Sequence, residues 1–281
     1  MSDLSVSTAG KQAIPDRIPA GPKWTGPRDP APGSEYFAQP EYTRREIATH
    51  AAGALINAGV CAAVAVELVR GRGRRPVTRV LPATAGLLVG GYVADLMSGV
   101  LHWAFDTWFD EDMPGVRRMV LIVREHHIYP QRIFNYGLAQ DVGILSWFSL
   151  AGVAPTLLAA RRAGGTPGAG VYFAMATGLS FSVLLTLSLE FHKIGHRSET
   201  GKVVATLQDA GILLSNKHHM RHHSREHDSH YCLVNGVADR TLGRAGLFRL
   251  LERAVNASSG VLPRINDRLW RRRFGRWVSE S

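Results

Sequence analysis

The chain has 281 residues and a net charge of +10, with 33 Lys and Arg against 23 Asp and Glu. This length suits one large domain or two small ones, and this charge suits a nucleic acid or an anionic membrane surface as a partner. The two cysteines, Cys61 and Cys232, form no CxxC pair, which excludes a structural zinc ribbon and argues against a disulfide framework.

The first 42 residues are rich in Pro, Gly, Ser and charged side chains, and they show no hydrophobic periodicity. They also lack the apolar stretch of a signal peptide. We therefore expect residues 1–42 to form a disordered tail.

Four apolar blocks follow this tail. Residues 142–160 and 171–189 each run for nineteen residues without a charged side chain, close to the roughly 20 residues that cross a bilayer as a helix. The two earlier blocks are weaker, and the second of them contains Asp95. Alone, the weaker pair also suits buried helices of a soluble domain, but two strong spans are rare without a membrane. We predict an all-α integral membrane fold with four transmembrane helices at about 47–69, 80–105, 138–160 and 171–191, within a domain of residues 43–240.

Four spans place all eleven histidines after His50 on one side of the membrane. The choice of spans did not require this, so it supports the count of four. The positive-inside rule is divided: five arginines in residues 70–79 favour a cytoplasmic position for the opposite side, whereas sixteen Lys and Arg follow residue 192 on the histidine side. We expect a multi-pass protein of the inner (cell) membrane whose histidines face the cytoplasm.

Residues 241–281 alternate arginines with apolar residues, as in "GRAGLFRLLERAV" and "RLWRRRFGRW". This pattern is typical of amphipathic helices that lie on an anionic lipid surface. A basic RNA-binding tail is the alternative. Because membrane spans precede this tail, we favour lipid and expect no nucleic-acid partner.

Many histidines occur in pairs four residues apart, a spacing that places two side chains on one face of a helix. Imidazoles crowded at a membrane surface repel one another when protonated, and bound metal ions that keep them neutral explain the crowding. The predicted metal ligands are His102, Asp106, His126, His127, His192, His196, His218, His219, His222 and His223. Residues predicted to support these ligands are Glu125, Asp209, Asn216, His227 and His230.

This set is too large for one zinc site of three or four ligands and suits two ions. Imidazole binds iron, zinc and copper alike, and iron is the choice for oxygen chemistry at a hydrocarbon. A rival motif, "HSREH" at residues 223–227, matches the inverted zincin pattern with Glu226 as the base, but it leaves the earlier histidines unexplained. His50 begins the first span, away from the other histidines, and is not an expected ligand.

The strings "ADLMSGVLHWAFDTW", "REHHIYPQRI", "EFHKIGHRSE" and "LQDAGILLSNKHHMRHH" resemble those of the plasmanylethanolamine desaturase family. The resemblance covers roughly residues 90–240, and the length and tails are similar to those of bacterial members. Two departures concern the ligand set: Val123 stands where many lipid desaturases have the first histidine of an HxxHH box, and Asp106 stands where a second histidine is common.

The resemblance implies an enzyme that introduces a vinyl-ether double bond into the alkyl chain of an ether phospholipid, giving a plasmalogen. It implies two iron ions as cofactors, O2 as co-substrate and an external electron donor of the ferredoxin or cytochrome type, and the chain itself shows no NAD or flavin fingerprint. A lipid hydroxylase would share the same histidines. A membrane metal sensor or transporter is the non-enzyme alternative, although transport predicts ionisable groups deep in several spans and only Asp95 is so placed.

Overall fold

The computed structural model describes residues 42–70, 77–109, 113, 115–128, 130–164, 167–224 and 227–263. These residues form helices and connecting turns, with no strand among them. The elements are α1 (Arg44–Arg70), α2 (Val77–Thr107), α3 (Arg117–Ile128), η2 (Pro130–Asn135), α4 (Leu138–Arg162), α5 (Ala169–Thr186), α6 (Ser188–His196), α7 (Lys202–Asp209), α8 (Asn216–His223), η3 (Asp239–Gly243) and α9 (Leu247–Ser259).

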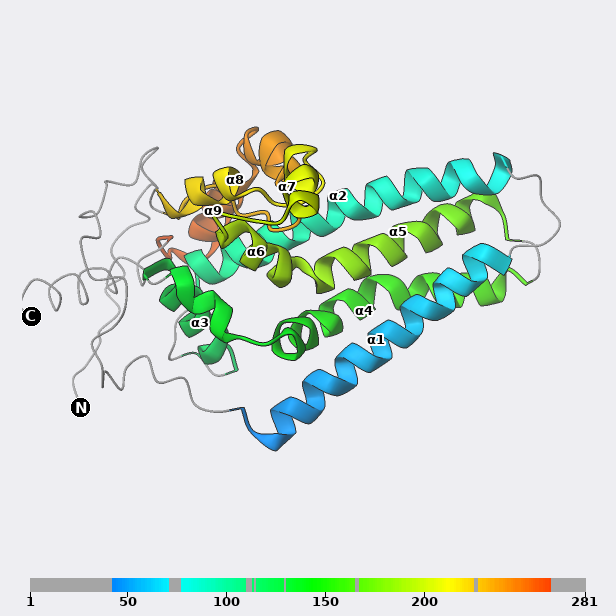
Figure 1. Ribbon diagram of the computed structural model, residues 1–281, viewed down its shortest axis with the longest axis horizontal. Helices are drawn as coiled ribbons and strands as arrows, with labels where there is room; N and C mark the ends of the chain where they lie inside the picture. The colour runs from blue at the N-terminus through cyan, green and yellow to red at the C-terminus, as the bar shows by residue number, and fades with distance from the viewer. Residues whose placement is uncertain are drawn as a thin grey trace, which may run out of the picture.

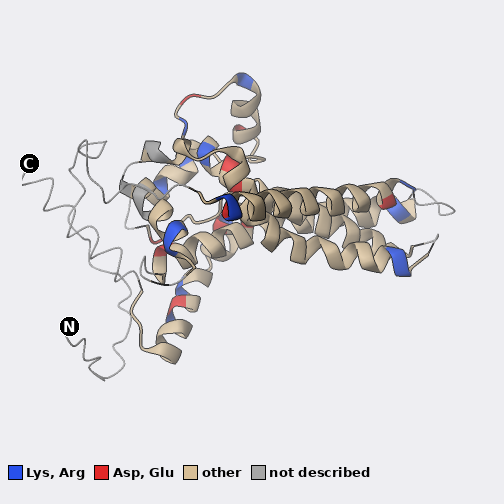
Figure 2. Cartoon of the chain, turned by 90° about the horizontal axis from the view of Figure 1, so that it is seen from below, with Lys and Arg blue, Asp and Glu red and all other residues tan. Residues whose placement is uncertain are grey.

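Four of these helices, α1, α2, α4 and α5, are long and apolar enough to cross a membrane. They run alternately up and down as one elongated bundle, and the short helices gather at one end of it (Figure 1). Charged side chains concentrate at the two ends and leave the middle of the bundle almost free of them (Figure 2). The predicted all-α fold with four transmembrane helices is therefore confirmed.

Small residues allow α2 and α5 to approach closely. Gly86 and Gly90 are one helical turn apart on α2, and a Cβ at either would collide with the backbone of α5, at the carbonyls of Phe173 and Thr177. Within lipid, the hydrophobic effect does not drive helices together. Close packing through small residues is therefore a usual way for them to associate.

A buried polar network explains why the first apolar block is weak. Asn57 of α1 accepts a hydrogen bond from Ser182 (2.8 Å) and donates one to Thr186 (3.1 Å), and Thr186 in turn donates to Ser149 of α4 (2.9 Å). The network ties α1, α4 and α5 together, so Asn57 faces protein rather than lipid.

The C-terminal end of α2 and the helices α3, α6 and α8 make up what we call the histidine cap. The chain reaches it from α5 through a break at Leu187, so the fourth long helix ends at Thr186, earlier than the expected position near residue 191. After the cap, α9 packs Phe248 and the fully buried Glu252 against Trp103 of α2. The first part of the predicted tail is thus docked onto the bundle, whereas residues 1–41 and 264–281 lie outside the described residues.

Candidate metal centre

Four helices deliver histidines to the same place. His102 and Asp106 lie one turn apart at the end of α2, and α3 contributes His126 and His127. The helix α6 adds His192 and His196 at the same spacing. Except for His127, which is partly exposed, these residues are buried, as are His219 and His222 of α8.

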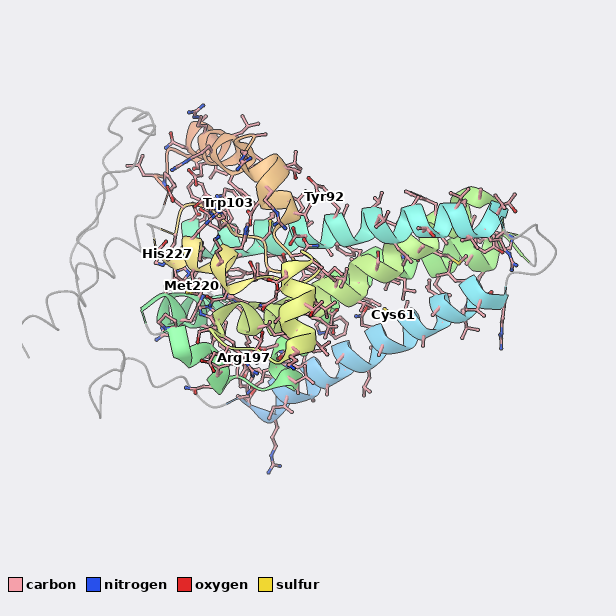
Figure 3. The ribbon with its side chains drawn as sticks, turned by 45° about the horizontal axis from the view of Figure 1, so that its top comes forward. Cys61, Tyr92, Trp103, Arg197, Met220 and His227 are labelled. Atoms are coloured by element: carbon pink, nitrogen blue, oxygen red, sulfur yellow. The ribbon has the colours of Figure 1, made fainter. Side chains whose placement is uncertain are left out.

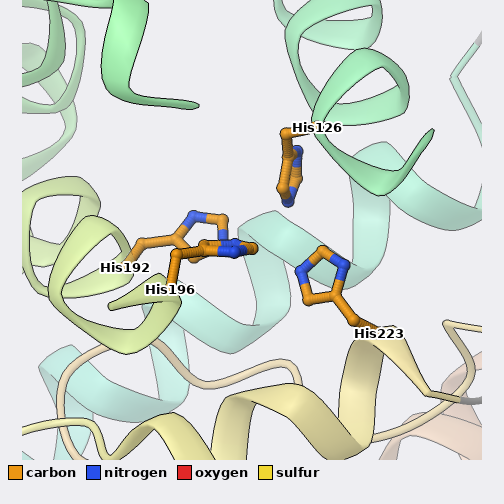
Figure 4. Close-up of side chains that lie close together, drawn as sticks. All are labelled: His126, His192, His196 and His223. Carbon is orange, nitrogen blue, oxygen red and sulfur yellow. The ribbon is translucent and has the colours of Figure 1, made fainter. Parts of the chain in front are cut away.

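Two groups of metal-binding side chains result, and within each group the candidate ligand atoms lie within 4.8 Å of one another. The first group is His126, His192, His196 and His223, shown in Figure 4. The second group is His102, Asp106, His127 and His222. Side chains far apart in the sequence are thus brought together as two neighbouring four-residue sets, each drawn from three helices.

In the second group, the Asp106 carboxylate lies among the three imidazoles. Its Oδ2 is 3.5 Å from Nε2 of His102 and 3.5 Å from Nε2 of His222, and its Oδ1 is 3.6 Å from Nε2 of His127. The Nε2 atoms of His222 and His127 are 3.1 Å apart. An aspartate on the same face of α2 as His102 therefore takes the position at which the second histidine of an HxxxH pair would stand.

His219 joins the first group, since its Nε2 lies 3.0 Å from Nε2 of His196 and 3.0 Å from Nε2 of His223. The Nε2 atoms of His192 and His196 are 3.2 Å apart. Metal–nitrogen bonds of about 2.0–2.1 Å hold neighbouring ligand atoms roughly 3 Å apart, so these separations suit a shared ion.

Backbone carbonyls set the tautomers of three histidines. Nδ1 of His102 donates to the Tyr231 carbonyl (2.9 Å), Nδ1 of His222 to that of Ser229 (2.9 Å), and Nδ1 of His126 to that of Ile122 (3.2 Å). Because a carbonyl oxygen only accepts, each Nδ1 carries the hydrogen and each Nε2 presents a lone pair to its group. Nε2 of His102 and of His126 is buried and makes no hydrogen bond to any described residue. This donor set fits metal ions.

Burial keeps these imidazoles neutral. Desolvation is the main cause that lowers the pKa of His196 to about 3, with a further contribution from His102. Burial, followed by neighbouring histidines, also lowers the pKa of His192 and His219 well below the usual value of 6.5. The same causes act on His126, His127, His222 and His223. A neutral imidazole has the lone pair that a metal requires.

His218, expected among the ligands, belongs to neither group. Its Nε2 is 3.0 Å from Oδ2 of Asp239, and its ring contacts that of His230. Asp239 holds His218 because this buried carboxylate forms a charge-assisted hydrogen bond with its Nε2. The role of His218 as a ligand therefore stays a prediction.

The predicted supporting residues divide in the same way. His227 stacks on His127, with ring centroids 3.7 Å apart, and Asn216 donates to the Gly195 carbonyl at 2.9 Å, joining α8 to α6. His230 lies beside His218, and Asp209 is exposed on α7. The side chain of Glu125 and the whole of Glu226 lie outside the described residues. His50, as expected, stays away and packs against Tyr42 and Gly143.

Two aspartates that the histidine spacing did not reveal position the segment beside the metal groups. Asp95 of α2 accepts hydrogen bonds from the backbone N–H groups of Val234, Asn235, Gly236 and Ala238, at 2.9–3.1 Å. Asp239 accepts from the N–H groups of Tyr231 and Cys232. A charged residue inside an apolar span requires such partners, which was the available signal for Asp95.

An apolar cavity of ≈ 100 Å³ leads to the histidines from the bundle. Its walls include Leu101, Phe105, Ile144 and Leu189, and His102, His126 and His192 also line it. Lys193, which pairs with Asp141 and with Glu190 (2.9 Å), also lines it.

A family model described as a lipid desaturase domain matches residues 91–266. The chain belongs to the lipid desaturase family. Fatty acid desaturase 4, chloroplastic, of Arabidopsis thaliana is 31% identical over 203 residues, which are 71% of this chain and 58% of the plant protein. This lipid desaturase is also 29% identical to the plasmanylethanolamine desaturase of Myxococcus xanthus over 184 residues, or 65% of this chain and 64% of that protein.

Plasmanylethanolamine desaturase 1 of Mus musculus is similarly 29% identical over 188 residues, which are 66% of this lipid desaturase and 69% of the mouse protein. The chain thus spans 58% of the Arabidopsis relative and 64% of the Myxococcus one. No solved structure matches this chain.

Proposed function

We propose that this lipid desaturase introduces the vinyl-ether double bond into the alkyl chain of an ether phospholipid of the plasmanylethanolamine type. The observation that carries the proposal is a mostly apolar cavity whose lining includes His102, His126 and His192, members of both metal groups. Two relatives named plasmanylethanolamine desaturase support this substrate. In balance, the chain carbons lose two hydrogens, and O2 with two electrons and two protons gives two waters.

The ligands we propose are the first group with His219 and the second group, each holding one iron ion. When bound, the two ions would supply the O2-dependent oxidation of an unactivated C–H bond. The protein's own work is to orient each Nε2 through its carbonyl partners, exclude water from the cavity, and present one pair of chain carbons to the histidines. The electrons come from an external redox donor, which we propose to be of the ferredoxin or cytochrome type.

Desaturation of an acyl chain is the second candidate, favoured by the plant relatives named fatty acid desaturase. The same cavity and the same metal groups would serve an acyl or an alkyl chain, because most of the cavity wall is apolar. The two candidates differ in the carbons that are presented to the metals, and hence in the position of the double bond.

Lipid mass spectrometry tests the proposal. Cells that express the chain are fed an alkyl-ether phospholipid, beside cells that express His222→Ala or the matched variant His50→Gln, which alters a histidine outside both groups. We expect an acid-labile product two mass units lighter, absent with His222→Ala and retained with His50→Gln.

Other outcomes contradict the proposal in distinguishable ways. An acid-stable product two mass units lighter identifies an acyl desaturase, and a gain of sixteen mass units identifies a hydroxylase. Unchanged lipids in cells supplied with a matching electron donor leave a metal sensor or transporter as the function.

We further propose the inner (cell) membrane as the location, with the histidine cap in the cytoplasm.

A further inference from the structure

A second cavity, of ≈ 510 Å³, lies beside the metal groups but outside them. It is bounded by α8, η3, α9 and the segment 228–230. His218 and Asp239, the buried pair that takes no part in the metal groups, form part of its floor. Nothing in the proposed reaction uses this second cavity. Polar and charged side chains form most of its lining, whereas the cavity beside His102, His126 and His192 is mostly apolar.

Cations dominate the rim of this cavity. Lys217, Arg221, Arg240, Arg244 and Arg249 all line it, against two carboxylates. Both carboxylates are already engaged, since Asp228 pairs with Arg249 at 2.7 Å and Asp239 accepts hydrogen bonds from His218 and two backbone N–H groups.

Four of the five cations therefore have no carboxylate partner among the residues that the structure describes. The side chains of Lys217, Arg221 and Arg244 are exposed, and Arg240 donates only to the neutral carbonyl of Asn235 (2.9 Å). Like charges that converge on one hollow repel one another unless an anion lies between them. Guanidinium groups match the oxygens of a phosphate in geometry as well as in charge, so a phosphate is the anion that this cavity suits best.

The cavity is also bounded by an element, η3, that contacts a candidate membrane span. Tyr92 of α2 shares a hydrogen bond of 2.8 Å with Thr241, which lies on η3 between Arg240 and Arg244 (Figure 3). The exposed Leu242, on the same short element, is consistent with contact to lipid.

We infer that this cavity binds the phosphate of a membrane phospholipid headgroup, through Arg221 and Arg244 with Lys217 and Arg240 around them. Free phosphate would satisfy the same charges, but the contact between η3 and a membrane span favours a phosphate presented by the bilayer. The inference concerns binding only, so it stands or falls separately from the proposed reaction.

The test uses the full-length chain purified in detergent and native mass spectrometry of bound lipid. Wild-type protein is compared with Arg221→Gln/Arg244→Gln and with the matched double variant Arg161→Gln/Arg162→Gln, which removes the same charge from exposed arginines at the other end of the bundle. The probes are phosphatidylglycerol, diacylglycerol of the same acyl chains, and inorganic phosphate. Because the substituted side chains are exposed, both variants are expected to fold, and thermal unfolding verifies this.

We expect phosphatidylglycerol to bind wild type and Arg161→Gln/Arg162→Gln equally, and to bind Arg221→Gln/Arg244→Gln at least about tenfold more weakly. Diacylglycerol, which lacks the phosphate, should show no such difference. Equal binding of phosphatidylglycerol to all three proteins would overturn the inference. Inorganic phosphate that binds as tightly as the lipid would also overturn it.

Discussion

The carboxylate of Asp95 organises the segment that supports the second metal group. Its two oxygens accept four backbone N–H groups of residues 234–238, and Ser98, one turn further along α2, accepts from Leu233 at 2.9 Å. This arrangement fixes the chain just after Tyr231, whose carbonyl orients His102. A residue deep in an apolar helix thus acts on the metal site through the backbone.

Asp95→Asn tests this role. The amide nitrogen of asparagine cannot accept, so at least the N–H of Ala238 loses its acceptor, and we expect a loss of about 1–3 kcal/mol in the free energy of unfolding. Iron affinity should fall as well, by about 10–100-fold, the usual effect of removing support for a ligand. Thermal unfolding and metal titration measure the two effects, and an unchanged iron affinity would show that Asp95 does not act on the site.

Substitutions of His218 and His222 test whether only one of these two α8 histidines is a metal ligand. His222→Gln removes a member of the second group, and we expect less than about 1% of wild-type product, since removal of a ligand disables the site that performs the chemistry. His218→Gln alters a side chain held by Asp239 and should retain at least about a tenth of the product. Lipid mass spectrometry at matched expression compares them, and equal losses would place His218 among the ligands after all.

At the scale of the helices, contact between α2 and α5 determines where His102 and Asp106 stand relative to α6. Gly86→Ala places a methyl group against the Phe173 carbonyl, and we expect it to destabilise the bundle by about 1–3 kcal/mol. Gly59→Ala is the matched control, because a Cβ there meets nothing within 4 Å and only helix propensity changes. Thermal unfolding in detergent measures both, and equal effects would contradict the proposed packing.

The helices of the histidine cap also determine how stability depends on pH. For metal-free protein, the folded-state pKa of His196 is about 3, against a usual value of 6.5. The unfolded chain therefore binds more protons below pH 6.5, so the stabilisation is present above that pH and is lost as the pH falls toward 3. We expect a lower thermal midpoint at pH 5.5 than at pH 7.5, whereas an unchanged midpoint would mean that the imidazoles of the cap are not buried.

The sequence predicts which histidines share a helix face, but it says much less about which histidines of different helices meet. Spacing of four residues predicted that His102 and Asp106, and likewise His192 and His196, share a helix face. It did not predict which histidines would meet, because that depends on how α3, α6 and α8 pack. His218 and His222 have the same spacing, yet only His222 reaches a metal group. The break at Leu187 contains no Pro or Gly to mark it.

For the whole molecule, the C-terminal ends of α1 and α4 and the N-terminal ends of α2 and α5 lie at the end of the bundle opposite the histidine cap (Figure 1). Single cysteines test the proposed sidedness, because both native cysteines are buried. In intact cells, we expect a membrane-impermeant maleimide to label Ala163→Cys, just after α4 at that end, and to leave Lys202→Cys on α7 unlabelled until the membrane is opened. The reverse pattern would place the histidine cap outside the cell.

The account depends most on the claim that the histidine cap holds two iron ions. Protein purified from iron-supplemented cells should contain about two irons per chain by elemental analysis, with a Mössbauer spectrum of nitrogen- and oxygen-ligated iron and no bound zinc. One iron per chain, or zinc in place of iron, would contradict the assignment of both groups as iron sites.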